Sequence, residues 1–141
     1  VIGETEKVVL EPAGTVLAAR VDSGATTSSI NAQDIELYGK DGKPWVRFSI
    51  PTADGQSSDY DLSVVRTASI KRHGAEPIER PVVKLKLRLG KSDQKRDFSL
   101  TDRSNFEFPV LLGRNYLNNT FLIDVSRKNL LHTIKLPAAK A

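Results

Sequence analysis

The chain has 141 residues, of which 39% are hydrophobic and 27% are charged. This length and balance favour one globular domain spanning residues 1–141 and exclude a disordered chain or a fibrous repeat. The net charge of +4 favours acidic partners, but the basic residues are scattered, so we expect no nucleic-acid binding. No apolar run approaches the ~20 residues that a membrane-spanning helix needs, so we expect no membrane span.

The chain contains no Cys and no Met. Without Cys the chain cannot form disulfides, thiolate zinc sites or cysteine nucleophiles. The histidines His73 and His132 lie far apart, and no phosphate-binding loop or dinucleotide fingerprint occurs, so we expect neither a metal nor a cofactor. Without Met the chain starts at Val1, which suggests a mature periplasmic chain after signal removal; a cytoplasmic chain trimmed at its start is the alternative.

In chain order, the first half of the sequence predicts strands. Residues 15–21 form an extended run that ends directly before Asp22. Residues 45–50 alternate apolar and polar side chains, which is the pattern of a half-buried strand. Residues 62–70 form another extended run, rich in Val and Thr. We expect a mobile loop at residues 52–59.

The second half predicts a hairpin, a helical turn and two further strands. Residues 81–89 alternate most clearly, and a turn at 90–94 leads to a return strand that includes Phe98 and Leu100. A second mobile loop is expected at 71–80, a short helical turn at 114–118, and strands at 121–125 and 129–136. Many short strands with almost no helical pattern indicate an all-β barrel or sandwich.

Two short segments carry the chemistry. Residues 21–28 read VDSGATTS directly after a predicted strand, and residues 110–117 read VLLGRNYL. An Asp-Ser-Gly triplet alone is weak, because a turn Asp followed by Gly is common. The two segments in this order are much more specific.

With these motifs the chain resembles the retropepsin-like aspartic proteases, which pair a strand-ending Asp-Thr/Ser-Gly-Ala with a later apolar-apolar-Gly-Arg-Asp/Asn. Over roughly residues 7–127 it is similar to a bacterial group labelled ATP-dependent zinc proteases, through residues 19–28, 41–48 and 108–114. The resemblance implies a small closed acid-protease barrel of roughly six or seven strands with short helical turns. Residues 45–60 look like an insertion relative to the viral enzymes.

The resemblance also implies an aspartic endopeptidase acting on a peptide or protein substrate. In such enzymes two Asp side chains share one proton, because like charges about 3 Å apart cannot both ionise. The chain has a single Asp-Ser/Thr-Gly motif, at Asp22. A homodimer with two-fold symmetry would therefore set Asp22 against its own copy.

Supporting roles follow from the same resemblance. Gly24 would allow a tight turn, Ser23 would brace the two catalytic loops of a dimer against one another, and Ala25 would leave room for the substrate. Leu111 and Leu112 would pack beneath the catalytic loop, before the motif glycine Gly113.

Two further features concern the flap and the dimer. A flap that closes over the substrate is expected at residues 67–80, with its tip near His73 and Gly74. Arg114 is the interface candidate, but Thr26 stands where retroviral subunits carry its Asp partner. We therefore expect a weak dimer, with Arg114 bonded to another acceptor, such as a backbone carbonyl, or left in water.

Two other functions stay open. The chain could be a catalytically weak or inactive relative that binds a peptide or partner through the same groove, linked to ATP-grasp ligases that attach glutamate. A role in trimming glutamate-rich peptides would fit that link. A metallopeptidase, as the group label implies, is the weakest hypothesis because no zinc-ligand set is present.

Overall fold

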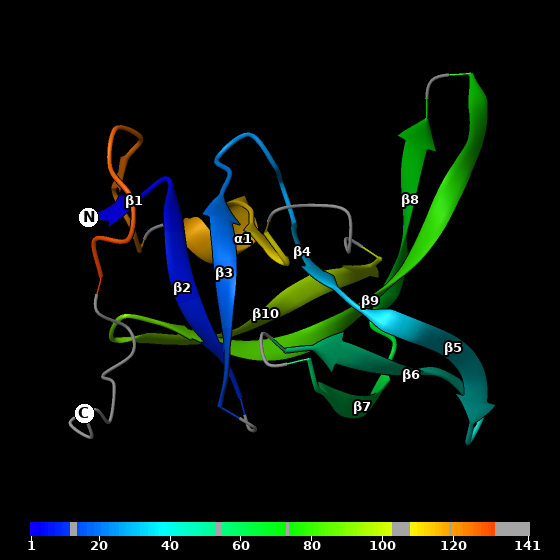
Figure 1. Ribbon diagram of the computed structural model, residues 1–141. Helices are drawn as coiled ribbons and strands as arrows, with labels where there is room; N and C mark the ends of the chain where they lie inside the picture. Colours follow the sequence, from blue (N-terminus) through cyan, green and yellow to red (C-terminus); the bar gives the residue numbers. More distant parts are fainter. Residues whose placement is uncertain (12–13, 53–54, 73, 103–107, 119, 132–141) are drawn as a thin grey trace.

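The computed structural model describes residues 1–11, 14–52, 55–72, 74–102, 108–118 and 120–131. Its main sheet is a closed ring, in which the strand order β10-β4-β11-β3-β2-β9 is completed by pairing of β9 with β10 (Figure 1). The ring confirms the predicted all-β barrel of the acid-protease type. Its strands are β2 (Thr5–Leu10), β3 (Thr15–Val21), β4 (Ser28–Asn31), β9 (Ala75–Leu89), β10 (Ser92–Thr101) and β11 (Val110–Leu112).

The β9–β10 hairpin forms as the alternation at residues 81–89 predicts. The two strands are antiparallel, and Phe98 lies opposite Val83. The apolar side chains at residues 81–89 of β9 are buried, whereas Lys84 and Lys86 point to solvent. Burial of these alternate side chains against the other ring strands stabilises the barrel. The core includes Leu10, Leu17, Ile30, Val83, Leu87, Phe98, Leu100 and Leu112.

A second sheet of three antiparallel strands lies beside the ring (Figure 1). Its middle strand contains the predicted strand at 45–50, and Val46, Phe48 and Ile50 are buried in the same core as the ring. Its strands are β5 (Gln33–Lys40), β6 (Lys43–Pro51) and β7 (Ser57–Ser63). The insertion expected at residues 45–60 thus lies in β6, in β7 and in the connection between them.

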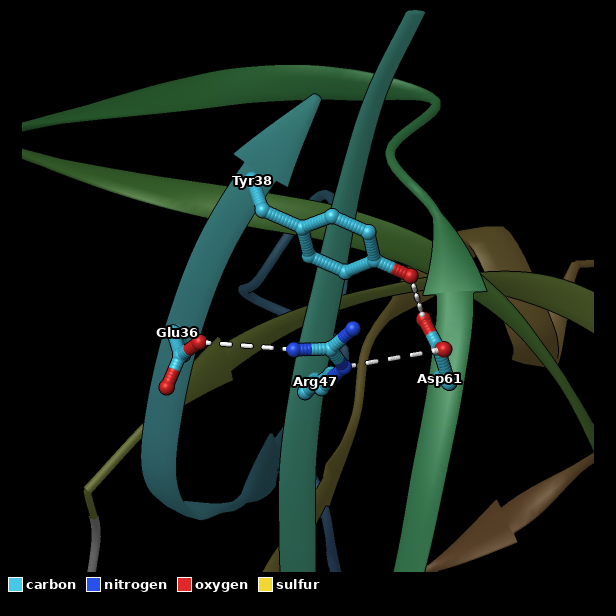
Figure 2. A network of polar contacts seen from close by, with 4 residues as sticks. All are labelled: Glu36, Tyr38, Arg47 and Asp61. Atoms are coloured by element: carbon cyan, nitrogen blue, oxygen red, sulfur yellow. Dashed lines mark hydrogen bonds and ion pairs between the residues drawn. The ribbon is translucent and has the colours of Figure 1, made fainter. Parts of the chain in front are cut away.

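The outer face of this sheet carries a network of exposed polar contacts, shown in Figure 2. Arg47 lies between Glu36 and Asp61, at N···O distances of 3.5 and 3.8 Å. Its guanidinium also lies 4.2 Å from the centre of the Tyr38 ring, and the Tyr38 hydroxyl donates to Asp61. All three charged side chains are about half exposed or more, so water competes for each contact.

The predictions of mobile loops at residues 52–59 and 71–80 are wrong in part, because both segments contain strand residues. Residues 57–59 belong to β7, and the described part of 71–80 belongs to β8 (Arg66–Arg72) and β9, apart from the turn residue Gly74. Their polar composition hid the strands, because β7 alternates exposed Ser and Asp with the inward Tyr60 and Leu62. The predicted run at 62–70 is likewise interrupted, because the chain leaves one sheet at Ser63 and joins the other at Arg66.

The first and last strands of the described chain form a separate two-stranded sheet. β1 (Ile2–Gly3) pairs in parallel with β12 (Ile123–Asp124), within the predicted strand at 121–125. The predicted strand at 129–136 does not form at 129–131, and its remainder lies outside the described residues. Instead, the backbone N–H groups of Leu130 and Leu131 donate to the buried carboxylate of Glu6, at 2.8 and 3.1 Å. Tertiary contact with Glu6 thus replaces a strand ladder.

One helix, α1 (Arg114–Leu117), occurs in the described part of the chain, and it confirms the helical turn expected at 114–118. No helix among the described residues is long and apolar enough to cross a membrane.

Candidate active site

Asp22 lies at the end of β3, where three strands meet. β11 lies between β3 and β4, parallel to the first and antiparallel to the second. The ladder pairs Leu112 with Val21, and the Asp22 N–H then donates to the Leu112 carbonyl at 2.9 Å. The two sequence motifs are therefore brought together by a ladder that ends at the aspartate.

The Asp22 side chain is oriented by its own loop. Its Oδ1 accepts a hydrogen bond from the Gly24 N–H at 2.9 Å, and its carbonyl accepts one from the Ala25 N–H at 3.2 Å. A Cβ at Gly24 would lie 3.2 Å from Oδ1, so the absence of a side chain permits this close approach. Asp22 is half-buried, whereas Ser23 and Gly24 are exposed. The carboxylate is thus fixed at one oxygen and open to solvent.

Two backbone hydrogen bonds join the second motif to the Asp22 loop. The Arg114 N–H donates to the Ala25 carbonyl at 2.8 Å, and the Asn115 N–H donates to the Thr26 carbonyl at 3.1 Å. A Cβ on Gly113 would lie 2.4 Å from the Thr27 carbonyl oxygen, closer than real Cβ atoms come. Glycine is therefore required at 113 by the packing of the two backbones.

A buried serine joins the two motifs. The Ser28 hydroxyl accepts from the Gly113 N–H at 2.9 Å and donates to Asn115 Oδ1 at 2.7 Å. Asn115 Nδ2 in turn donates to the Asp97 carbonyl on β10, at 2.8 Å. Ser28 and Asn115 lie within the two sequence motifs, but the sequence predicted no role for either residue. The available signal for such a role was that both residues lie in motifs that were expected to contact each other.

Leu111, Leu112 and Ser23 were also predicted to support the site. Leu112 is fully buried and Leu111 half-buried, under the loop that they were expected to support. The Ser23 hydroxyl is exposed and makes no hydrogen bond in the described part of the chain. Its bracing role concerns a second subunit and stays a prediction.

Arg114 is bonded to an acceptor that was not predicted from the sequence. Its guanidinium donates to the Thr26 hydroxyl at 2.9 Å, and the side chain is exposed. The expectation of another acceptor named a backbone carbonyl, whereas the acceptor is the side chain at the position where viral enzymes carry Asp. The contact thus joins the same two positions as the ion pair of the viral enzymes, but its acceptor is a neutral hydroxyl.

The hairpin of β8 and β9 occupies residues 67–80, where the flap was expected. Thr67 lies opposite Pro81, and Gly74 makes the turn with a φ of 71°, a left-handed conformation that suits glycine. Figure 1 shows the hairpin tip rising on the same side of the molecule as the end of β3. His73 lies outside the described residues, so its place at the tip stays a prediction.

The described residues contain no group of three or more His, Cys, Asp and Glu side chains arranged to hold a metal ion. The site itself offers one oriented carboxylate in an exposed loop. A carboxylate so placed can accept a proton from water or hold one for a carbonyl oxygen.

Comparison with known proteins gives three kinds of match. Residues 1–133 match the RimB-like family, described as retropepsin-like aspartic endopeptidase RimB. Proteins of Shewanella pealeana and Desulfotalea psychrophila, each named probable alpha-L-glutamate ligase, are 32% identical over 89% and 77% of this chain. The matched part spans only 28% and 24% of those proteins. A solved Legionella pneumophila protein of unknown function is 31% identical with a TM-score of 0.79, over 92% of this chain and 95% of that chain.

Proposed function

Since the chain belongs to the RimB-like family of retropepsin-like aspartic endopeptidases, we propose that it hydrolyses peptide bonds in a peptide or protein substrate. The observation that carries the proposal is the Asp22 carboxylate, fixed at Oδ1 by the Gly24 N–H and open to solvent at the end of β3. A base that must activate water needs both of these properties, because water has to reach it and its orientation has to be fixed.

A second carboxylate is needed, and we propose that Asp22 of the partner subunit in a symmetric homodimer supplies it. With one shared proton, the ionised carboxylate takes a proton from a water whose oxygen attacks the peptide carbonyl carbon. The protonated carboxylate gives its proton to the carbonyl oxygen. The carboxyl that took the proton from water then gives it to the nitrogen as the C–N bond breaks, and one hydroxyl of the diol intermediate returns a proton to the other carboxylate, which leaves a carboxyl group, an amine and one shared proton.

The loop geometry supports a dimer of this kind. Ser23 and Gly24 are exposed beside Asp22, so a symmetry mate can approach the carboxylate. The exposed Ser23 hydroxyl is free to bond across the two-fold axis. Because Arg114 is bonded to a neutral hydroxyl, no charge pair adds to the interface, and we propose a weak dimer.

The named relatives favour a narrower substrate class. The matched part is about a quarter of proteins named probable alpha-L-glutamate ligases, so a domain like this one shares a polypeptide with another region. Joined domains commonly act on one substrate, because linkage raises their effective concentration. We therefore propose a substrate that carries glutamate. The second candidate function is that of a weakly active or inactive relative that binds a peptide or partner and is linked to such ligases. The similarity to the probable ligases supports this candidate as well.

The test replaces one carboxylate at a time. Asp22→Asn removes the charge and keeps the shape, so cleavage of unfolded protein or acidic peptides at mildly acidic pH should fall by a factor of at least about 10³. Asp41→Asn, in the exposed β5–β6 turn, is the matched control and should leave activity unchanged. Equal activity of the Asp22→Asn variant and the parent would overturn the proposal. An inactive parent that still binds acidic peptide would favour the binding relative.

Assembly is tested by dilution. Light scattering and specific activity, measured on the same samples, should fall together as dimers separate. A monomer whose specific activity is constant over the whole series would contradict the shared site. The periplasmic location expected from the sequence stays a proposal, which cell fractionation tests.

A further inference from the structure

A hollow of about 510 Å³ lies between β7 and the β9–β10 hairpin, away from the candidate active site. It is lined in part by Tyr60 and Leu62 from one side and Lys86 and Lys95 from the other, with Glu11 at its margin. Glu11 follows β2, whose last residue pairs with the start of β3, whereas Asp22 follows the end of β3. The seven residues of β3 span about 20 Å, so the two sites lie near opposite ends of one strand.

The Tyr60 hydroxyl is the first unexplained group. It is buried and has no hydrogen-bond partner among the residues that the structure describes. Its ring is held by stacking on Phe48, with centroids 5.4 Å apart and planes 11° apart, so the hydroxyl has little freedom to seek one. Burial, aided by the charge of Glu11, raises the Tyr60 pKa, so the group stays a proton donor at neutral pH. Buried polar groups are nearly always satisfied, so an orphaned donor here indicates a missing acceptor.

Lys95 is the second unexplained group. It lies directly opposite Lys86 in the β9–β10 ladder, and like charges in this position repel. Lys86 is paired with Asp93 at 3.4 Å, whereas Lys95 has no ion pair in the described part of the chain. An anionic group in the hollow would offset the repulsion and give Lys95 a partner.

The lining limits how much negative charge the ligand can carry. Lys84 is paired with Asp97 at 2.9 Å and Glu11 with Arg88 at 3.9 Å, so the lining residues together with these partners carry four positive and three negative charges, which leaves one net positive charge. That balance fits a single carboxylate better than the repeated phosphates of a nucleic acid. Leu62 and Leu85 also line the hollow and offer apolar contact to the methylene groups of a side chain.

We propose that this hollow binds a carboxylate side chain of an acidic peptide segment, with the Tyr60 hydroxyl and the Lys95 ammonium as its donors. The site would hold an acidic segment toward the end of β3 that lies opposite Asp22, and β3 has a length of about 20 Å, which about six extended residues span. The proposal concerns binding alone and stands whether or not Asp22 is catalytic.

The test is a titration of the full chain, labelled with ¹⁵N, by acetyl-Gly-Glu-Gly-Glu-Gly-amide. Amide shifts should change at residues 60–62, 84–86 and 93–95. The matched peptide with Gln in place of Glu should bind at least about tenfold more weakly, because a hydrogen bond to a charged group is worth about 1.5–3 kcal/mol. Tyr60→Phe should weaken binding of the Glu peptide by about tenfold and leave the melting temperature unchanged or raised, because it removes a hydroxyl that has no partner.

Two control variants separate this site from general charge effects. Tyr38→Phe removes an exposed tyrosine hydroxyl on the outer face of the same sheet, and Lys7→Gln removes an exposed lysine on β2. Both should bind the Glu peptide like the parent, whereas Lys95→Gln should bind it more weakly. The proposal fails if the two peptides bind equally, if the shifts map to residues 22–27, or if Tyr60→Phe binds like the parent. Tighter binding of inorganic phosphate than of the Glu peptide at these residues would overturn the assignment to a peptide.

Discussion

The loop around Asp22 and the outer face of the β5–β6–β7 sheet both contain hydrogen-bonded networks, but they differ in access to water. Ser28, at the centre of the first, is completely buried, and its neighbours Gly113 and Asn115 rely on its hydroxyl. Arg47, at the centre of the second, has 56% of its side chain exposed (Figure 2). Breaking the buried network leaves groups that water cannot satisfy, at about 1–3 kcal/mol, whereas an exposed ion pair is worth about 0–1 kcal/mol. The buried network therefore contributes more to holding its part of the chain in place than the exposed network does.

The sharpest contrast is expected from the same substitution in each region. Leu112→Asp would bury a charge beneath the Asp22 loop and should lower the free energy of unfolding by about 4 kcal/mol or more. Leu37→Asp, at a position that is 61% exposed on β5, should cost less than about 1 kcal/mol. Urea unfolding followed by circular dichroism measures both. Parent-like stability of Leu112→Asp would mean that this end of the ring is not packed as described.

Glycine substitutions test the backbone packing. Gly113→Ala should cost about 2 kcal/mol or more, because its Cβ would overlap the Thr27 carbonyl group and force the loop to move. Gly39→Ala on β5 meets nothing within 4 Å and should be neutral or stabilising by up to about 1 kcal/mol. Thermal melts of the two variants rank them. A Gly39→Ala variant that melts lower than Gly113→Ala would reverse the comparison.

Two serines give a finer test of the hydrogen bonds. Ser28→Ala should cost about 1–3 kcal/mol, because the Gly113 N–H and the Asn115 side chain lose a buried partner. Ser49→Ala removes a hydroxyl that donates to the exposed Asp59 at 2.8 Å, and it should cost less than about 0.5 kcal/mol. Amide hydrogen exchange at Gly113 should also speed up in Ser28→Ala alone. Unchanged exchange there would show that the hydroxyl does not hold the loop.

The smallest effect is expected on the outer face of the sheet. Arg47→Gln removes both ion pairs in Figure 2 and should change the free energy of unfolding by no more than about 1 kcal/mol, less at high salt. Denaturant titrations at low and high salt measure the difference. A loss as large as that of Leu112→Asp would contradict the view that exposure decides the energy.

Much of the barrel could be read from local patterns. The alternation at 81–89 predicted β9 and its buried face, because a strand that faces both core and water must alternate. The VDSGATTS and VLLGRNYL segments predicted the residues of the candidate site, because their backbone and packing requirements are local. The strands at 5–10, 28–31 and 33–40 were missed, and residues 57–59 of β7 were taken as part of a loop, because at least half of the residues in each segment are polar.

Tertiary structure alone decided the contacts between residues far apart in the chain. Ser28 reaches Gly113 across 85 positions and Glu6 reaches Leu130 across 124, and nothing in the local sequence specifies either pair. The unpartnered hydroxyl of Tyr60 and the facing lysines of β9 and β10 likewise became visible only when β7 was placed against the ring. Local sequence determined the most regular strands, such as the buried half of β9, and the turn residues of the two motifs, since backbone preference and alternation act within a few residues. Folding determined which polar groups share a buried space, because that depends on how the sheets close on one another.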